Sequence, residues 1–290
     1  MATEKVIEAV YGPPAPHWVG DGFPVRGYFS AIPGGMRRLS PFLLLDYAKP
    51  FEFAPTDNER RGVGPHPHRG FETVTIAFQG AVAHHDSMGN SGVIHPGDVQ
   101  WMTAGSGILH REYHDAAFAR NGGNFQMAQI WVNLPAVHKM TEPAYQAIAA
   151  DMMGVSELPM GRVTVIAGEY RGVKGPAHTF SPINLLEVRL QAGGSAELPV
   201  PEDWNAALLV MAGEANINDR KTQENDLVLF KRQGEGINVK ATSDAHLLLL
   251  SGEPIDEPVA NYGPFVMNTP AEIEQAIHDF RDGKFGHLDE

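Results

Sequence analysis

Histidines and one glutamate recur in the stretch 65–114 at a spacing that suits metal binding. Seven of the chain's 13 histidines fall there; His66 and His68 stand two residues apart, as do His110 and Glu112. On a β-strand, side chains two residues apart point to the same face. Three neutral imidazoles and one carboxylate suit a divalent transition metal, with positions left open for water, O2 or substrate. The spacing therefore predicts a mononuclear metal site.

The residues between the two pairs predict strands joined by tight turns. Residues 73–78 are mostly β-branched or aromatic and end before Gly80, whereas 95–98 has the composition of a turn. Another short apolar run follows at 99–102. A small antiparallel barrel places a site inside its mouth in this way. The stretch therefore indicates an all-β domain in which the two pairs meet.

Two residues close to the pairs have roles that the sequence leaves open. Glu72 follows His68 closely, and we expect it either to support the site or to replace Glu112 as a ligand. His114 shares strand parity with His110 and Glu112. Because a metal-bound imidazole usually donates its other nitrogen to an acceptor, His114 could contact a ligand from outside.

Other polar residues are expected away from the chemistry. Asp46 could line the barrel mouth, but a turn aspartate at a strand end is the favoured interpretation. His84 and His85 fall in the polar stretch 83–90, where we expect solvated side chains, and His95 is assigned to a turn.

The stretch 126–131 predicts a further strand, one face of which should line a barrel cavity. Gln129 and Trp131 share one face, and Gln126 lies on the other with Ala128 and Ile130. The pattern leaves open which of the two faces points inward.

The sequence resembles the cupin superfamily and, within it, the pirin family. Three segments carry the resemblance most clearly: 66–73 (His-Pro-His-Arg-Gly-Phe-Glu-Thr), 96–105 and 107–112 (Gly-Ile-Leu-His-Arg-Glu). Residues 41–46 and 131–135 are similar to the early strand of that family and to the segment that closes its first domain. The resemblance covers nearly the whole chain.

The resemblance implies a bicupin, which is two β-barrels in one chain, with a metal in the first. It implies His66, His68, His110 and Glu112 as ligands, and Fe(II) as the metal, with another divalent transition metal left open. It also implies a dioxygenase of the quercetin 2,3-dioxygenase type, acting on a flavonoid or similar polyphenol, with Glu112 or Glu72 accepting the substrate proton. The alternative is an iron-dependent regulator that binds other proteins, with the metal as a structural or redox switch.

The charge balance argues against two classes of partner. Lys and Arg total 22 against 35 Asp and Glu, a formal net charge of −13. Binding to nucleic acid or to an anionic membrane needs positive charge, so we expect a small aromatic substrate or a protein partner instead. The absence of cysteine excludes disulfides and thiolate catalysis. Residues 1–6 show no secretory signal and no stretch is long enough to span a membrane, so a cytoplasmic protein is expected.

The second half predicts a diverged copy of the first without its metal site. Gly80 matches Gly213, and the stretch 105–107 matches 234–236. Counted from these anchors, the residues opposite the four predicted ligands are, in order, Pro199, Pro201, Val239 and Ala241. A shift by one residue offers Asn238 and Lys240 for the last two. Neither choice rebuilds a site, so a role in packing or partner contact is expected.

We therefore predict three parts: a metal-binding barrel at 1–135, a connector at 136–161 and a second barrel without metal at 162–290 that ends in a short helix. Thr269 and Glu272 form a capping box for that helix. An apolar stripe predicts that it docks on a barrel.

Overall fold

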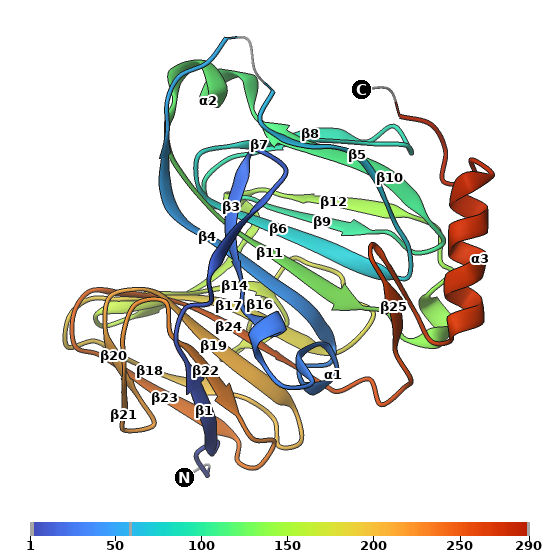
Figure 1. Cartoon of the computed structure of the whole chain (residues 1–290). Helices are drawn as coiled ribbons and strands as arrows, with labels where there is room; N and C mark the ends of the chain where they lie inside the picture. Colours follow the sequence, from blue (N-terminus) through green and yellow to red (C-terminus); the bar gives the residue numbers. More distant parts are fainter. Residues whose placement is uncertain (1–2, 58–59, 289–290) are drawn as a thin grey trace. The chain divides into compact units, whose positions relative to one another are not determined.

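The computed structural model describes residues 3–57 and 60–288, which consist mainly of β-strands (Figure 1). The strands form two seven-stranded sheets, two four-stranded sheets and two pairs of short strands. Within the described residues the longest helix is α3 (Pro270–Arg281), and none combines the length and apolar composition needed to cross a membrane. The predicted all-β fold with a short C-terminal helix is confirmed.

The chain divides into two compact units, each built on one large and one small sheet. We call them the first barrel and the second barrel. The first barrel comprises residues 15–37, 42–150 and 255–290, and the second comprises residues 1–14, 38–41 and 151–254.

The first barrel has two antiparallel sheets. Its large sheet has the order β12 (Ala144–Ile148), β9 (Val99–Thr103), β6 (Phe71–Gln79), β11 (Gly123–Asn133), β4 (Phe42–Phe53), β3 (Phe23–Gly27) and β2 (Pro16–Val19). Its small sheet has the order β5 (Gly62–His68), β10 (Ile108–His114), β7 (Val82–Asp86) and β8 (Ser91–Ile94). The remaining elements are η1 (Phe29–Ala31), α1 (Gly35–Arg38), α2 (Ala116–Asn121), η2 (Ala136–His138), η3 (Ala150–Met152), β25 (Ala260–Tyr262) and β26 (Phe265–Met267), of which α1 and η3 run into the second barrel.

The second barrel repeats this strand order. Its large sheet has the order β1 (Ile7–Tyr11), β22 (Leu227–Phe230), β19 (Asn205–Ala212), β24 (Ala245–Gly252), β17 (Ile183–Leu190), β14 (Gly161–Ala167) and β13 (Gly154–Leu158). Its small sheet has the order β18 (Ser195–Pro199), β23 (Gly236–Ala241), β20 (Ala215–Ile217) and β21 (Arg220–Thr222), and a short pair is formed by β15 (Glu169–Tyr170) and β16 (Val173–Lys174).

The pairing register identifies the residues that replace the predicted ligands in the second barrel. Ala196 pairs with Val239 across β18 and β23, as His66 pairs with His110 across β5 and β10. The four replacements are, in order, Ala196, Leu198, Val239 and Ala241. Counting along the sequence placed the counterparts of His66 and His68 three residues too late. The reason is that the loop from β18 to β19 spans 200–204, whereas β5 and β6 are separated only by 69–70. All four replacements belong to the apolar core of this barrel.

The segment predicted as a connector contributes one strand to the large sheet of each barrel. β12 pairs with β9 in the first barrel, whereas β13 pairs with β14 in the second. The two ends of the chain do not follow the predicted order of the barrels. β1 belongs to the second barrel, whereas residues 255–290 belong to the first. The predicted domain limits, of which residues 1–2 and 289–290 lie outside the described residues, stay a prediction.

Helix α3 contacts the first barrel beside the predicted site. The expected capping box is present, since Glu272 N donates to Thr269 Oγ1 and Thr269 N donates to Glu272 Oε2. Further along the helix, Asp279 Oδ2 accepts a hydrogen bond of 2.8 Å from Arg69 Nη1, and both side chains are largely buried. Because Arg69 follows His68, the helix braces the end of the strand that carries the first histidine pair.

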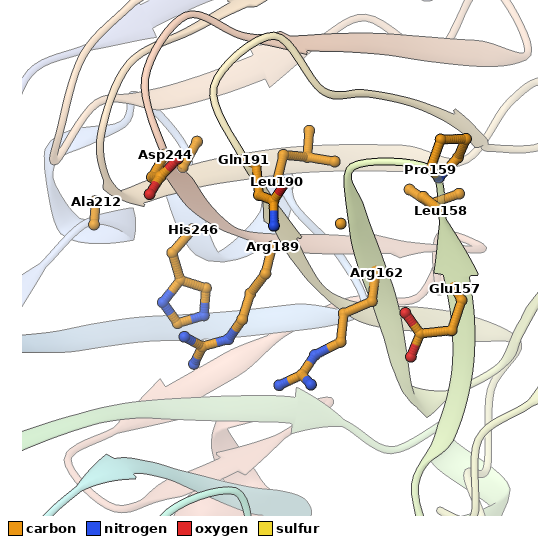
Figure 2. Close-up of a pocket in the computed structure, with 12 residues that line it drawn as sticks. Glu157, Leu158, Pro159, Arg162, Arg189, Leu190, Gln191, Ala212, Asp244 and His246 are labelled. Atoms are coloured by element: carbon orange, nitrogen blue, oxygen red, sulfur yellow. The ribbon is translucent and has the colours of Figure 1, made fainter.

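The lining of a cavity of about 540 Å³ on the second barrel includes the titratable side chains Glu157, Arg162, Arg189, Asp244 and His246 (Figure 2). Arg162, Arg189 and His246 are neighbours across β14, β17 and β24. Glu187 Oε1 accepts hydrogen bonds of 2.7 Å from both Arg189 Nε and His246 Nε2, and Glu157 stands opposite Arg162. The two hydrogen bonds of Glu187 join it to Arg189 and His246 in one structural network.

The substitution Glu187→Gln should lower the free energy of unfolding by about 2–3 kcal/mol at pH 7. Burial alone would raise the pKa of Glu187, but the hydrogen bond and charge of His246, together with Arg189, lower it to about 2. Because this folded value lies below the unfolded value, the contribution is present above about pH 4.5 and lost as the pH falls towards 2.

Urea unfolding at several pH values measures this effect. Glu197→Gln serves as the control, because Glu197 is exposed on β18 and its ion pair with Arg171 is long, at 3.8 Å. Equal stability of Glu187→Gln and the unsubstituted protein at pH 7 would contradict the prediction.

Candidate metal centre

Three histidines from two paired strands gather in the first barrel. His66 and His68 lie on β5, and His110 lies directly opposite His66 on β10. One ring nitrogen of each histidine lies within 4.8 Å of those of the other two. The ring centroids are 4.3–4.9 Å apart. Strand alternation and this register together bring the predicted His-x-His pair to His110.

The hydrogen bonds of these rings leave one nitrogen of each histidine available. His66 Nδ1 donates to Gly64 O at 2.8 Å, and His68 Nδ1 donates to Pro264 O at 3.4 Å. His110 Nε2 is buried and has no hydrogen-bond partner among the described residues. A buried nitrogen without a partner is unfavourable unless a ligand occupies it. The three histidines therefore fit a transition-metal ion.

Burial also sets the protonation state of the inner histidines. It lowers the pKa of both His68 and His110 well below the usual value, and the neighbouring His66 lowers them further. Both rings are consequently neutral at pH 7. Neutral imidazole is the form that binds metal ions.

Glu112 lies at the same cavity but is held by polar neighbours. Its Oε1 atom is 3.1 Å from Thr75 Oγ1 and accepts a hydrogen bond of 3.2 Å from Gln100 Nε2. A bulge separates Glu112 from His110 in the pairing of β10 with β5. The carboxylate forms a metal-capable group with His84 and His110, whereas the three predicted histidine ligands form a separate group without it. A role for Glu112 as fourth ligand stays a prediction.

Glu72 points away from the histidines. It stands three residues before Thr75 on β6, and such residues lie on opposite faces of a strand. Thr103 Oγ1 donates to Glu72 Oε1 at 2.8 Å, and burial raises the pKa of Glu72 to about 7. Among the described residues Glu72 belongs to neither metal-capable group. The alternative in which it replaces Glu112 has no support in this geometry.

His114 belongs to an aromatic cluster. Its ring stacks on Phe125 with centroids 4.8 Å apart and meets Phe53 edge-on at 4.5 Å. Its Nε2 atom donates to Gly22 O at 2.9 Å. Four residues along a strand correspond to roughly 13 Å, so shared parity with His110 does not bring the two side chains together.

The prediction that His84 faces solvent was wrong. His84 lies on β7, its side chain is fully buried, and its Nδ1 atom is 3.5 Å from His110 Nδ1. Its Nε2 atom donates to Asp86 Oδ2 at 3.2 Å. With His84 protonated at Nε2, its Nδ1 accepts from His110 Nδ1, which leaves His110 Nε2 for a metal. The alternation of Val82, His84 and Asp86 is the sequence signal that could have revealed this strand.

The substitution His84→Leu should weaken Fe(II) binding by about 10- to 100-fold, because groups that orient a ligand histidine contribute on this scale. His84→Asn should bind more tightly than His84→Leu, since its amide oxygen can replace the Nδ1 acceptor. Anaerobic titration against a competing chelator measures the affinities. His85→Leu, on the same strand but partly exposed, is the matched control. Equal affinities for all of these proteins would contradict the orienting role.

A cavity of about 400 Å³ opens beside the histidines. Its lining comprises Val19, Phe23, Val25, Leu44, Asp46, Val63, His66, His68, Glu112, Met127, Gln129, Trp131 and Pro264. Gln129 and Trp131 therefore form the inward face of β11. Asp46 also lines the cavity, so its interpretation as a turn residue was wrong. The site combines a histidine cluster with a largely apolar chamber, an arrangement suited to small organic ligands.

Comparison with known proteins agrees with this architecture. The Pirin family model matches residues 22–132, and the model of the pirin C-terminal cupin domain matches residues 185–286. A Pseudomonas aeruginosa protein, named provisionally as a quercetin 2,3-dioxygenase, is 50% identical over 97% of this chain and 98% of its own. Human pirin is 37% identical over 87% of this chain and 84% of its own.

A solved structure shows the same fold. The crystal structure of a quercetin 2,3-dioxygenase from Acinetobacter baumannii superposes with a TM-score of 0.94 at 49% identity, and it covers 99% of this chain and 100% of its own. The two family models together with these relatives show that the chain is a two-cupin protein, and it belongs to the pirin family.

Proposed function

We propose that this protein is a metal-dependent dioxygenase of the quercetin 2,3-dioxygenase type that cleaves a ring of a flavonoid or similar polyphenol. The observation that carries the proposal is the position of His66 and His68 on the wall of a 400 Å³ cavity. A purely structural site would not need such a chamber. The relatives named as quercetin 2,3-dioxygenases over almost the full chain support the same reaction.

The proposed ligands are His66, His68, His110 and Glu112, with Fe(II) as the proposed metal. When bound, such an ion supplies Lewis acidity and brings two reactants together. The residues of the chain supply the rest. Neutral His68 and His110 bind without first losing a proton, and His84 keeps the His110 ring in place.

Glu112 is the proposed proton acceptor. Thr75 and Gln100 contact its Oε1 atom, whereas its Oε2 atom has no hydrogen bond within the described chain. That free oxygen can take the proton of a substrate hydroxyl at the cavity. The rings of Trp131 and Phe71, whose centroids are 4.3 Å apart, pack beside His68 and keep water from this side.

Oxygen uptake tests the proposal. The protein is loaded with Fe(II) without oxygen, quercetin is added, and O2 consumption is followed after mixing with buffer that contains oxygen. We expect uptake that requires both metal and quercetin and that His66→Ala abolishes. Tight Fe(II) binding without uptake would reject the dioxygenase and favour the iron-dependent regulator, for which capture of protein partners in the two iron states is the next measurement.

A further inference from the structure

The carboxyl group of Asp46 lies on the wall of the cavity. On β4, Leu44 and Asp46 line the cavity, whereas Leu45 and Tyr47 are buried on the other face. Among the described residues, none forms a hydrogen bond or ion pair with this carboxyl group, and burial raises its pKa to about 6 against the opposing effect of His17. A largely buried carboxylate is costly unless it is hydrogen-bonded. A ligand can supply the missing donor.

Asp46 stands at one end of a row of polar side chains on the cavity wall. The register places Gln129 beside Asp46 and Thr75 beside Gln129. Gln100 follows beside Thr75. Thr75 Oγ1 lies 2.8 Å from Gln129 Oε1 and 3.1 Å from Glu112 Oε1. With strands about 4.8 Å apart, the backbones of Asp46 and Thr75 are separated by roughly 10 Å.

The wall around this row is apolar. Phe23, Val25 and Met127 line it, and the Trp131 ring meets His68 edge-on with centroids 5.4 Å apart. Flat aromatic ligands bind well between such surfaces. The cavity therefore has a histidine end, apolar walls and a row of polar side chains whose far end is Asp46.

We propose that Asp46, with Gln129 beside it, binds a hydroxyl group at the end of the substrate remote from the metal. The hydroxyl donates to the Asp46 carboxylate. This assignment rests on the proposed function for the metal end, and it adds a requirement on the substrate. The substrate should have more than one ring and carry hydroxyl groups at both ends, because Asp46 lies two strands, or roughly 10 Å, from Thr75, which contacts Glu112.

A binding experiment with two flavones tests the two ends of the cavity separately. Quercetin has hydroxyl groups on all its ring systems, whereas 3-hydroxyflavone keeps only the hydroxyl beside its carbonyl. Binding to the Fe(II)-loaded protein without oxygen is followed by tryptophan fluorescence, because Trp131 lines the cavity. Asp46→Leu should weaken quercetin binding by about 10- to 100-fold, as expected for a hydrogen bond to a charged group. Its affinity for 3-hydroxyflavone should stay within about twofold.

The control and a second variant keep the test decisive. Glu52→Leu changes an exposed carboxylate on the same strand and should affect neither flavone. Asp46→Asn keeps the shape and a neutral acceptor, so its loss should lie between those of the unsubstituted protein and Asp46→Leu. Equal weakening of both flavones, or of neither, would overturn the assignment.

The titration also distinguishes this assignment from the proposed reaction, since no turnover occurs without oxygen. Selective loss of quercetin binding in Asp46→Leu, together with absence of O2 uptake by the unsubstituted protein, would support the role of Asp46 and reject the dioxygenase. Uptake without selective loss would do the reverse.

Discussion

Replacing His110 with alanine is expected to lower the affinity for Fe(II) by about 100- to 1,000-fold. Metal sites with four protein ligands bind with roughly 10–16 kcal/mol, or about 2.5–4 kcal/mol per ligand, which corresponds to this factor. His110 is fully buried, and its Nε2 atom has no other partner in the described chain. Loss of the ring also removes the group that His84 orients.

The metal content after anaerobic loading and the affinity against a chelator measure this effect. His66→Ala should behave similarly with less disturbance of the fold, because His66 is partly exposed. His95→Ala, in an exposed turn, is the control and should keep full binding. Oxygen uptake with quercetin should disappear in both of the first two variants. Retention of stoichiometric, tightly bound Fe(II) in His110→Ala would exclude this histidine as a ligand.

Replacing Lys139 with methionine is expected to lower the free energy of unfolding by about 3–6 kcal/mol. Lys139 is fully buried and donates to three oxygen atoms at 2.7–2.9 Å, namely Gly70 O, Asn133 Oδ1 and Val266 O. Each acceptor left without its donor costs about 1–3 kcal/mol. Burial lowers the pKa of Lys139 to about 8, so most of the side chain is charged at pH 7.

Thermal and urea unfolding measure this loss, and the melting temperature should fall by roughly 10 °C for a unit of this size. Lys49→Met, which changes an exposed lysine on β4, should stay within about 0.5 kcal/mol of the unsubstituted protein. Because Gly70 lies two residues after His68, weaker Fe(II) binding should accompany the loss of stability. A loss below about 1 kcal/mol would contradict the role of the three hydrogen bonds.

Features that depend only on residues close together in the chain could be predicted from the sequence. The spacing of His66 and His68 fixes their common face, because side chains alternate along any extended strand. The capping box at Thr269 and Glu272 is equally local, since its bonds join residues three apart. The turn at His95 also follows from its own Pro-Gly sequence.

The tertiary structure decided which of these faces meet. His84 contacts His110 because β7 pairs with β10, and Asp46 lies in one row with Thr75 because β4 and β6 both flank β11. Arg69 bonds to Asp279 across 210 residues. Such contacts depend on strand pairing and loop length, which short-range periodicity does not contain. The sequence therefore pointed to the His-x-His pair and to His110, whereas long-range register decided that His84 contacts His110 and that Asp46 lines the cavity.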